Sequence, residues 1–193
     1  MAENDDIRTT RRQREAGYSL IEIMIVCCLI GIVSAMAVPV SSTFLVQRKA
    51  DSAIVSTLGA VNAARDRAVA ERRNIQMTFI APNHIRLSRV EVPGGALTQV
   101  DEFTLDNGQI FVKFATVPDT PDAFGAASST SFSGTMPVMF TSDGSLLDSN
   151  GDISNGSIFV GFAGQTDTAR AVTIFGVSGL TRAWKWRGRK WME

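Results

Sequence analysis

The sequence predicts an α+β protein in which one long N-terminal helix packs on an antiparallel sheet. The segment from Ile23 to Gln47 carries no charged residue and is mostly aliphatic. After it, Ile54, Leu58 and Val61 follow at spacings of three or four residues, the period of an amphipathic helix. Beyond Asn74 the chain changes to short runs rich in Ile, Val, Phe and Thr, which are typical of strands.

Length and composition narrow the class of protein. The chain has 193 residues, with 19 basic and 19 acidic side chains and 45% hydrophobic residues. This length fits one domain, or a small domain with a membrane anchor. The apolar content excludes a disordered chain. The balanced charge gives no reason to expect a nucleic-acid binder from the protein as a whole, so charge is informative only segment by segment.

The apolar stretch over residues 18–40 has the length of a membrane span. As a helix it would measure about 35 Å, against about 30 Å for the hydrocarbon layer of a bilayer. Four arginines precede it, at positions 8, 11, 12 and 14, and basic residues favour a cytoplasmic N-terminus. We therefore expect a single-pass inner-membrane protein whose C-terminal part is periplasmic or lies on an extracellular filament.

A cleaved secretory signal is the alternative, since residues 35–37 (Ala-Met-Ala) offer a small-x-small cleavage site. However, the apolar region before this site is longer than the roughly 7 to 15 residues of such a signal. Glu22 also interrupts it, and a carboxylate at the bilayer centre costs about 2.5 to 3.5 kcal/mol, although less near the interface. A plain signal or anchor gains nothing from that charge, so we expect Glu22 to have a specific role.

Residues 17–22, Gly-Tyr-Ser-Leu-Ile-Glu, resemble the processing site of type IV prepilins and type II secretion pseudopilins. The resemblance implies that prepilin peptidase cuts between Gly17 and Tyr18, removes a leader of residues 1–17 and methylates Tyr18, which replaces the usual Phe. It also implies that Pro39 is the helix-kinking proline of this superfamily. Glu22 would then pair with the terminal amine of a neighbouring subunit and set the register of a filament, rather than add net stability.

Beyond residue 40 the helix is predicted to continue as an amphipathic segment over 41–73, with Pro39 bending it. An antiparallel β domain is predicted over 74–181, because short links rich in turn residues favour hairpins. A stretch over 116–137, rich in Ala, Ser, Thr and Pro, is predicted to be a long mobile loop. The predicted strands are 74–81, 85–92, 97–105, 110–115, 138–141, 157–162 and 171–177.

Three segments, Phe140 to Gly144, Ser157 to Val160 and Arg170 to Ile174, are followed by Gly179. In this pattern the C-terminal part resembles the GspH/FimT-type minor pseudopilins. The resemblance implies a pilin fold and a minor subunit at or near the tip of a type II secretion pseudopilus or a type IV pilus, which share all of these residues. The implied partners are other pilins or pseudopilins, prepilin peptidase and the inner membrane.

The predicted tail, residues 182–193, is strongly basic and holds all three tryptophans. Basic groups neutralise phosphates and aromatic faces stack on bases, so the alternative function is a pilus-associated DNA receptor. FimT-type receptors carry a Gly-Arg-x-Arg tail, whereas the aligned residues 179–182 here lack the first arginine. The alternative interpretation of this tail is a patch that contacts filament neighbours or the membrane. The candidate DNA-binding residues are Arg182, Trp184, Lys185, Trp186, Arg187, Arg189, Lys190 and Trp191.

The sequence offers no catalytic constellation. The single histidine, His84, is expected at the surface, and both cysteines lie inside the apolar run. There is no Gly-x-Ser-x-Gly elbow and no phosphate-binding loop. The acidic turn over 148–152 has oxygen ligands at alternate positions, but Ile153 and Phe159 stand where a calcium loop needs Gly and Glu. We therefore expect no enzyme activity, no cofactor and no metal site.

Overall fold

The computed structural model describes residues 17–105 and 108–193, without the side chains of residues 36–43. The predicted leader, apart from Gly17, therefore lies outside the described residues. The chain divides into two compact units, Met1–Ser42 and Thr43–Glu193. Helix α1 (Leu20–Glu71) is a single element that includes Pro39. In the part of the chain that the structure describes, no helix combines the length and apolarity that crossing a membrane requires.

Within the first unit, the described side chains of α1 are all exposed. Ile21 is 65% exposed and Val33 is 67% exposed. Their aliphatic neighbours on the helix are exposed to similar degrees. A continuous apolar surface of this kind marks a segment that meets another protein or a membrane.

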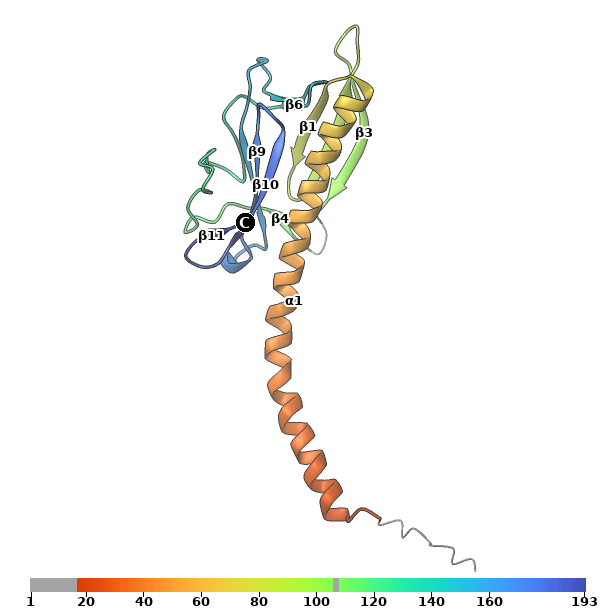
Figure 1. Cartoon of the computed structure of the whole chain (residues 1–193), viewed down its shortest axis with the longest axis vertical. Helices are drawn as coiled ribbons and strands as arrows, with labels where there is room; N and C mark the ends of the chain where they lie inside the picture. Colours follow the sequence, from red (N-terminus) through yellow and green to blue (C-terminus); the bar gives the residue numbers. More distant parts are fainter. Residues whose placement is uncertain (1–16, 106–107) are drawn as a thin grey trace, which may run out of the picture. The chain divides into compact units, whose positions relative to one another are not determined.

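Among the described residues, nine antiparallel strand pairings build two sheets in the second unit (Figure 1). The first sheet has the order β3-β2-β1-β6-β7, and the second has the order β11-β10-β9-β8-β4, with β5 also paired to β8. The first sheet comprises β1 (Ile75–Ile80), β2 (His84–Val90), β3 (Leu97–Thr104), β6 (Val138–Phe140) and β7 (Leu146–Leu147). The second comprises β4 (Ile110–Phe111), β5 (Thr130–Phe132), β8 (Gly156–Gly161), β9 (Arg170–Phe175), β10 (Leu180–Trp186) and β11 (Trp191–Met192), with the short 3₁₀ helix η1 (Thr166–Thr168) before β9.

The C-terminal half of α1 packs against both sheets and closes the main core. Ala60, Ala64 and Ala68 recur every four residues and are fully buried, so their small side chains let the helix backbone approach the strands closely. They share one cluster with Phe140 of the first sheet and Ile174 of the second. Figure 1 shows this part of α1 lying along β1 and β3.

Strands β8 and β9 at the centre of the second sheet are buried on both faces. Their alternate residues point to opposite sides of the sheet. Ile158, Val160 and Ile174 face the main core. Their neighbours on the opposite face, Phe159 and Ala171 among them, join a second, smaller cluster. The other buried members of this second cluster are Val117, Ala169, Trp184, Trp186 and Trp191.

The predicted α+β fold, with a long N-terminal helix and antiparallel strands, is confirmed. Each predicted strand corresponds to an observed one, although β4 is shorter than expected. Most of the loop predicted over 116–137 has no regular structure, but β5 lies within it and Val117 is 2% exposed. The predicted tail, 182–193, is not separate from the β domain, since β10 and β11 occupy most of residues 180–192.

Candidate functional site

The residues of the predicted processing motif stand at the start of α1. Gly17, Tyr18 and Ser19 have no regular structure, and Tyr18 is 78% exposed. The backbone N–H of Glu22 donates to the carbonyl of Ser19 at 3.0 Å, which begins the helix. Glu22 lies in the first turn and is exposed. A negative charge in this turn interacts favourably with the helix dipole, while the side chain of Pro39 lies outside the described residues.

The three tryptophans of the predicted tail lie in the second core. Trp184 is 8% exposed, Trp186 is 7% exposed and Trp191 is 9% exposed. The rings of Trp186 and Trp191 meet edge to face, with centroids 5.5 Å apart. The indole N–H of Trp191 donates to the carbonyl of Pro118 at 3.1 Å. The protein's own packing covers most of each indole, so stacking on bases would require these rings to leave the second core.

The basic residues of the predicted tail fall into two groups. Arg182 donates to Asp122 at 2.9 Å, and Lys185 lies 3.1 Å from Asp51, so both are paired. The other three, Arg187, Arg189 and Lys190, are exposed in the turn that joins β10 and β11. Within the described residues they form no ion pair, and the turn is closed by the Arg187 N–H donating to the carbonyl of Lys190 at 3.0 Å.

Asp122 connects the chain that crosses the outer face of the second sheet to β9 and β10. Its Oδ2 accepts from the Thr173 hydroxyl at 2.6 Å and from the Trp184 indole N–H at 3.0 Å, and its Oδ1 accepts from Arg182 at 2.9 Å. The Asp122 side chain is only 7% exposed. Asp119 supports this segment by accepting from the backbone N–H groups of Thr120 and Gly125. The long-range bonds of Asp122 and the local bonds of Asp119 together hold in place a segment that composition alone had suggested was mobile.

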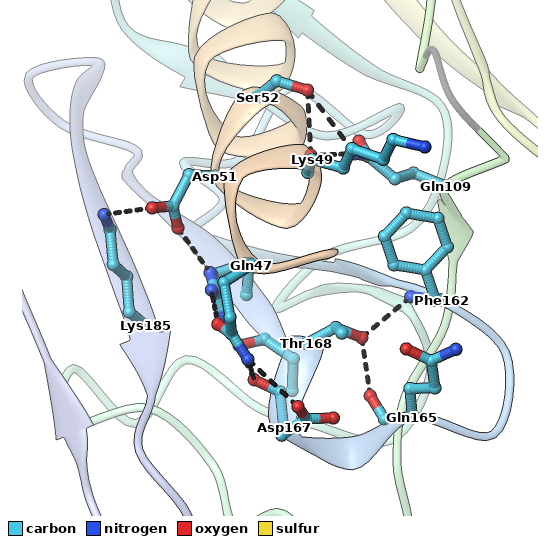
Figure 2. Close-up of polar contacts among 12 residues, drawn as sticks. Gln47, Lys49, Asp51, Ser52, Gln109, Phe162, Gln165, Asp167, Thr168 and Lys185 are labelled. Carbon is cyan, nitrogen blue, oxygen red and sulfur yellow. Dashed lines mark hydrogen bonds and ion pairs between the residues drawn. The ribbon is translucent and has the colours of Figure 1, made fainter. Parts of the chain in front are cut away.

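A polar junction joins α1 to the second sheet, around Asp51 and Arg170 (Figure 2). Arg170, on β9, is 2% exposed, and its Nε donates to Asp51 Oδ1 at 2.9 Å. Its Nη2 donates to Gln47 Oε1 at 2.7 Å, and its Nη1 donates to the carbonyls of Asp167 and Ala169. The guanidinium thus donates four hydrogen bonds, two to side chains of one turn of α1 and two to backbone carbonyls of the short segment before β9.

Asp51 is shared between two cations. Burial by itself would raise the pKa of its carboxyl group, but hydrogen bonds from Lys185 and Arg170, with their positive charges, outweigh it and lower the pKa from its ordinary value. Figure 2 shows Lys185 reaching Asp51 from β10, while Gln47 points to Asp167. Helix η1 positions Asp167, and the buried Thr168 hydroxyl, which accepts from the Phe162 N–H at 3.0 Å, secures that turn.

A second contact flanks the junction on α1. The Gln109 side-chain amide donates to the carbonyl of Lys49 and lies 3.5 Å from the Ser52 hydroxyl. Gln109 is fully buried just before β4, so its amide meets the helix from the other edge of the second sheet. Four residues of these contacts were not predicted from the sequence: Gln47, Asp51, Gln109 and Arg170. Their partners lie far away in sequence, and no local pattern identifies them.

Arg65 of α1 explains two glycines of the C-terminal resemblance. Gly144 (φ 85°) and Gly179 (φ 63°) both turn with a positive φ. A Cβ on Gly144 would come within 3.1 Å of the Arg65 Nε, and one on Gly179 would meet both Arg65 and the carbonyl of Gly144. The two turns and the arginine therefore pack together at a distance that only glycine permits.

The acidic turn over 148–152 is organised around a buried carboxylate. Asp148 is 3% exposed, and it accepts hydrogen bonds from the backbone N–H groups of Thr135, Asn150 and Asp152 at 2.8 to 3.0 Å. These bonds, led by the one from Thr135, lower its pKa from the ordinary value. The lone pairs that a cation would use are thus directed at the protein's own backbone.

Comparison with solved structures finds proteins of similar fold. One is the minor pseudopilin EpsH from the type 2 secretion system of Vibrio cholerae, with 11% identity and a TM-score of 0.48 over 71% of this chain and 97% of that one. Another is the type IV minor pilin FimU of Pseudomonas aeruginosa, with 14% identity and a TM-score of 0.43 over 80% and 98% of the two chains. Both belong to the pilin and pseudopilin superfamily that the sequence resembles. No family model and no curated protein matches the chain.

Proposed function

We propose that this protein is a minor pilin or pseudopilin, a structural subunit that assembles with other pilin-type subunits at or near the tip of a filament. The observation that carries the proposal is the Gly17-Tyr18 pair directly ahead of a 52-residue helix with Glu22 in its first turn. Such a helix offers apolar side chains for packing between subunits. Glu22 offers a charge that only a matched neighbour would neutralise.

In this proposal the segment over 18–40 holds the protein in the inner membrane before assembly. Prepilin peptidase would cut on the cytoplasmic side and methylate the amine of Tyr18. The lack of charge from Ile23 to Gln47 supports membrane insertion, and the lack of a side chain on Gly17 suits an extended backbone in a protease cleft. The second unit would then face outward, toward neighbours or cargo.

Mass spectrometry of the membrane-extracted protein tests the processing step. We expect a mature chain that begins with N-methylated Tyr18, and Gly17→Leu should leave an uncut precursor. A control change in the leader, Thr9→Ala, should be processed normally. A mature N-terminus at Val38 would instead show that the segment is an ordinary cleaved signal.

Replacement of Glu22 tests the assembly step separately. Glu22→Gln keeps the shape of the side chain but removes the charge, so processing and insertion should proceed while incorporation into filaments falls sharply. Glu22→Asp keeps the charge and should retain part of the incorporation. Normal incorporation of Glu22→Gln would contradict the proposed register role.

Co-purification with the subunits of either machine would distinguish a type II secretion pseudopilus from a type IV pilus.

DNA binding is a second candidate function, on a smaller set of residues than the sequence suggested. The exposed turn with Arg187, Arg189 and Lys190 favours it, since these three cations are available for phosphates. With the tryptophans buried, binding would rest on electrostatics. We expect micromolar or weaker affinity at physiological salt, falling steeply as salt rises.

A fluorescence anisotropy titration at several salt concentrations tests this candidate. Arg189→Ala/Lys190→Ala should weaken binding and reduce the salt slope by about 1.4 to 1.8, at roughly 0.7 to 0.9 for each phosphate contact. Arg48→Ala/Lys49→Ala removes the same charge from an exposed part of α1 and should leave the slope nearly unchanged. Absence of binding even at low salt would leave the purely structural role.

A further inference from the structure

Contacts between α1 and the sheets change in character along the helix. From Ala60 to Ala68 the helix contributes apolar side chains to the main core. From Gln47 to Ser52 its contacts with the second sheet are mainly polar, through Gln47, Asp51 and the carbonyl of Lys49, and Ala50 is the one buried apolar residue of this turn. The exposed Phe44 and Leu45 precede this turn and lie outside both buried clusters. The two parts of the helix are therefore held by different kinds of interaction.

The polar part depends on one buried cation. Arg170 is 2% exposed, and among the described residues Asp51 and Gln47 supply its only side-chain acceptors, at 2.9 and 2.7 Å. If this helix turn moved away, the guanidinium would lose both acceptors and keep only the carbonyls of Asp167 and Ala169. A buried charge without its partner is strongly unfavourable, so the contacts of this turn form and break together.

The charges around Asp51 make the junction sensitive to that one carboxylate. Arg170 from β9 and Lys185 from β10 face it, and Arg48 and Lys49 flank it on its own helix. Asp167, on η1, is the other acid at the junction, and it binds Gln47 at 3.0 Å. Loss of the Asp51 charge would leave Arg170 and Lys185 close together without an acid between them.

We propose that the turn from Gln47 to Ser52 is an ionic latch, which opens as a unit while α1 from Ala60 to Glu71 stays packed on the sheets. Closure requires an ionised Asp51 between Arg170 and Lys185. Protonation of Asp51, or its replacement by a neutral residue, opens the latch and leaves the apolar core intact. The inference concerns motion within the unit Thr43–Glu193 and holds whether or not the proposed function is correct.

Amide hydrogen exchange of the full chain in detergent micelles, read by mass spectrometry, tests the latch. Asp51→Asn keeps the side-chain size and mimics the protonated state. It should raise exchange in peptides covering 44–53 at least ten-fold, while peptides covering 60–71 stay within about two-fold of the wild type. Asp101→Asn is the matched control, because it breaks the 3.1 Å pair with Arg67, which also joins α1 to a strand. It should leave exchange over 44–53 unchanged.

Two results would overturn the proposal. One is an equal rise in exchange across 44–71 and β9, which would show that the junction is only part of the global fold. The other is no rise over 44–53. If Asp51→Asn fails to fold, Gln47→Ala and Lys185→Met provide milder breaks. Each should raise exchange over 44–53 by about two- to five-fold, and a failure of both to do so would equally overturn the latch.

Discussion

The indole N–H of Trp184 donates to Oδ2 of Asp122 at 3.0 Å, which joins β10 to the segment that crosses the outer face of the second sheet. The same carboxylate accepts from Thr173 and Arg182. With three donors on one buried group, Asp122 replaces the hydrogen bonds to water that these side chains would otherwise make. The basic, tryptophan-rich C-terminus is therefore an integrated part of the fold.

Replacement of Asp122 should destabilise the protein. Asp122→Ala leaves the donors of Thr173 and Arg182 without this acceptor and the Trp184 indole N–H with only the Thr173 hydroxyl at 3.1 Å, so we expect a loss of about 3 kcal/mol in the free energy of unfolding. Chemical denaturation followed by tryptophan fluorescence measures it. Asp66→Ala, at an exposed position of α1, should change the free energy by less than about 0.5 kcal/mol. Equal stability of the two variants would contradict the role of Asp122.

The tryptophans and the exposed cations should respond differently to mutation. Trp186→Ala removes a large buried ring from the second core and should cost about 3 to 5 kcal/mol of stability. Arg189→Ala, in the exposed turn next to it, should be neutral within about 0.5 kcal/mol. Denaturant midpoints provide the measurement. A stable Trp186→Ala protein with reduced affinity for DNA would instead restore the stacking hypothesis.

Alanine substitutions at two glycines with positive φ distinguish the stability cost of backbone strain from that of steric overlap. Gly188→Ala at φ 74° finds no atom within 4 Å of the new Cβ, so it should cost only the left-handed strain of about 1 to 2 kcal/mol. Gly179→Ala at φ 63° adds contacts with the Gly144 carbonyl and with Arg65, and should cost about 2 kcal/mol more. Thermal unfolding of the two variants measures the loss of stability in each. Similar losses would show that the Arg65 contact tolerates displacement.

The buried carboxylate of Asp148 should make the fold sensitive to acid. Hydrogen bonds from Thr135, Asp152 and Asn150 lower its pKa in the folded state below that of the unfolded chain. Its stabilising contribution is therefore complete above about pH 4 and is lost as the pH falls through the folded pKa.

Unfolding measured between pH 2 and 6 checks the effect of Asp148. Asp148→Asn should be less stable than the wild type at neutral pH, and the difference should shrink as the pH falls below about 4. Asp152→Asn changes an exposed carboxylate in the same turn and serves as the control. A difference between Asp148→Asn and the wild type that stays constant with pH would show that the charge of Asp148 does not stabilise the turn.

Local patterns in the sequence were sufficient to predict the helix and most strands. Apolar spacing through Ile54 and Val61 predicted the buried face of α1, and β-rich runs predicted strands such as β1 and β9. The motif at Gly17 and Glu22 is likewise local, and the proposed function rests on it. These features are encoded within a few residues of one another, because backbone preference and hydrophobic period act over one or two turns or one strand.

Tertiary structure alone decided the role of the C-terminal residues and the junction at Asp51. A segment rich in tryptophan and arginine has the same composition whether it stacks on a ligand or fills a core. Trp184 is buried because Asp122, from a distant loop, accepts its indole N–H, and Arg170 is buried because Asp51 and Gln47 cross over from α1. Such pairings join residues far apart in the chain, and the free energy that selects them, burial together with satisfied hydrogen bonds, exists only once helix and sheets have packed.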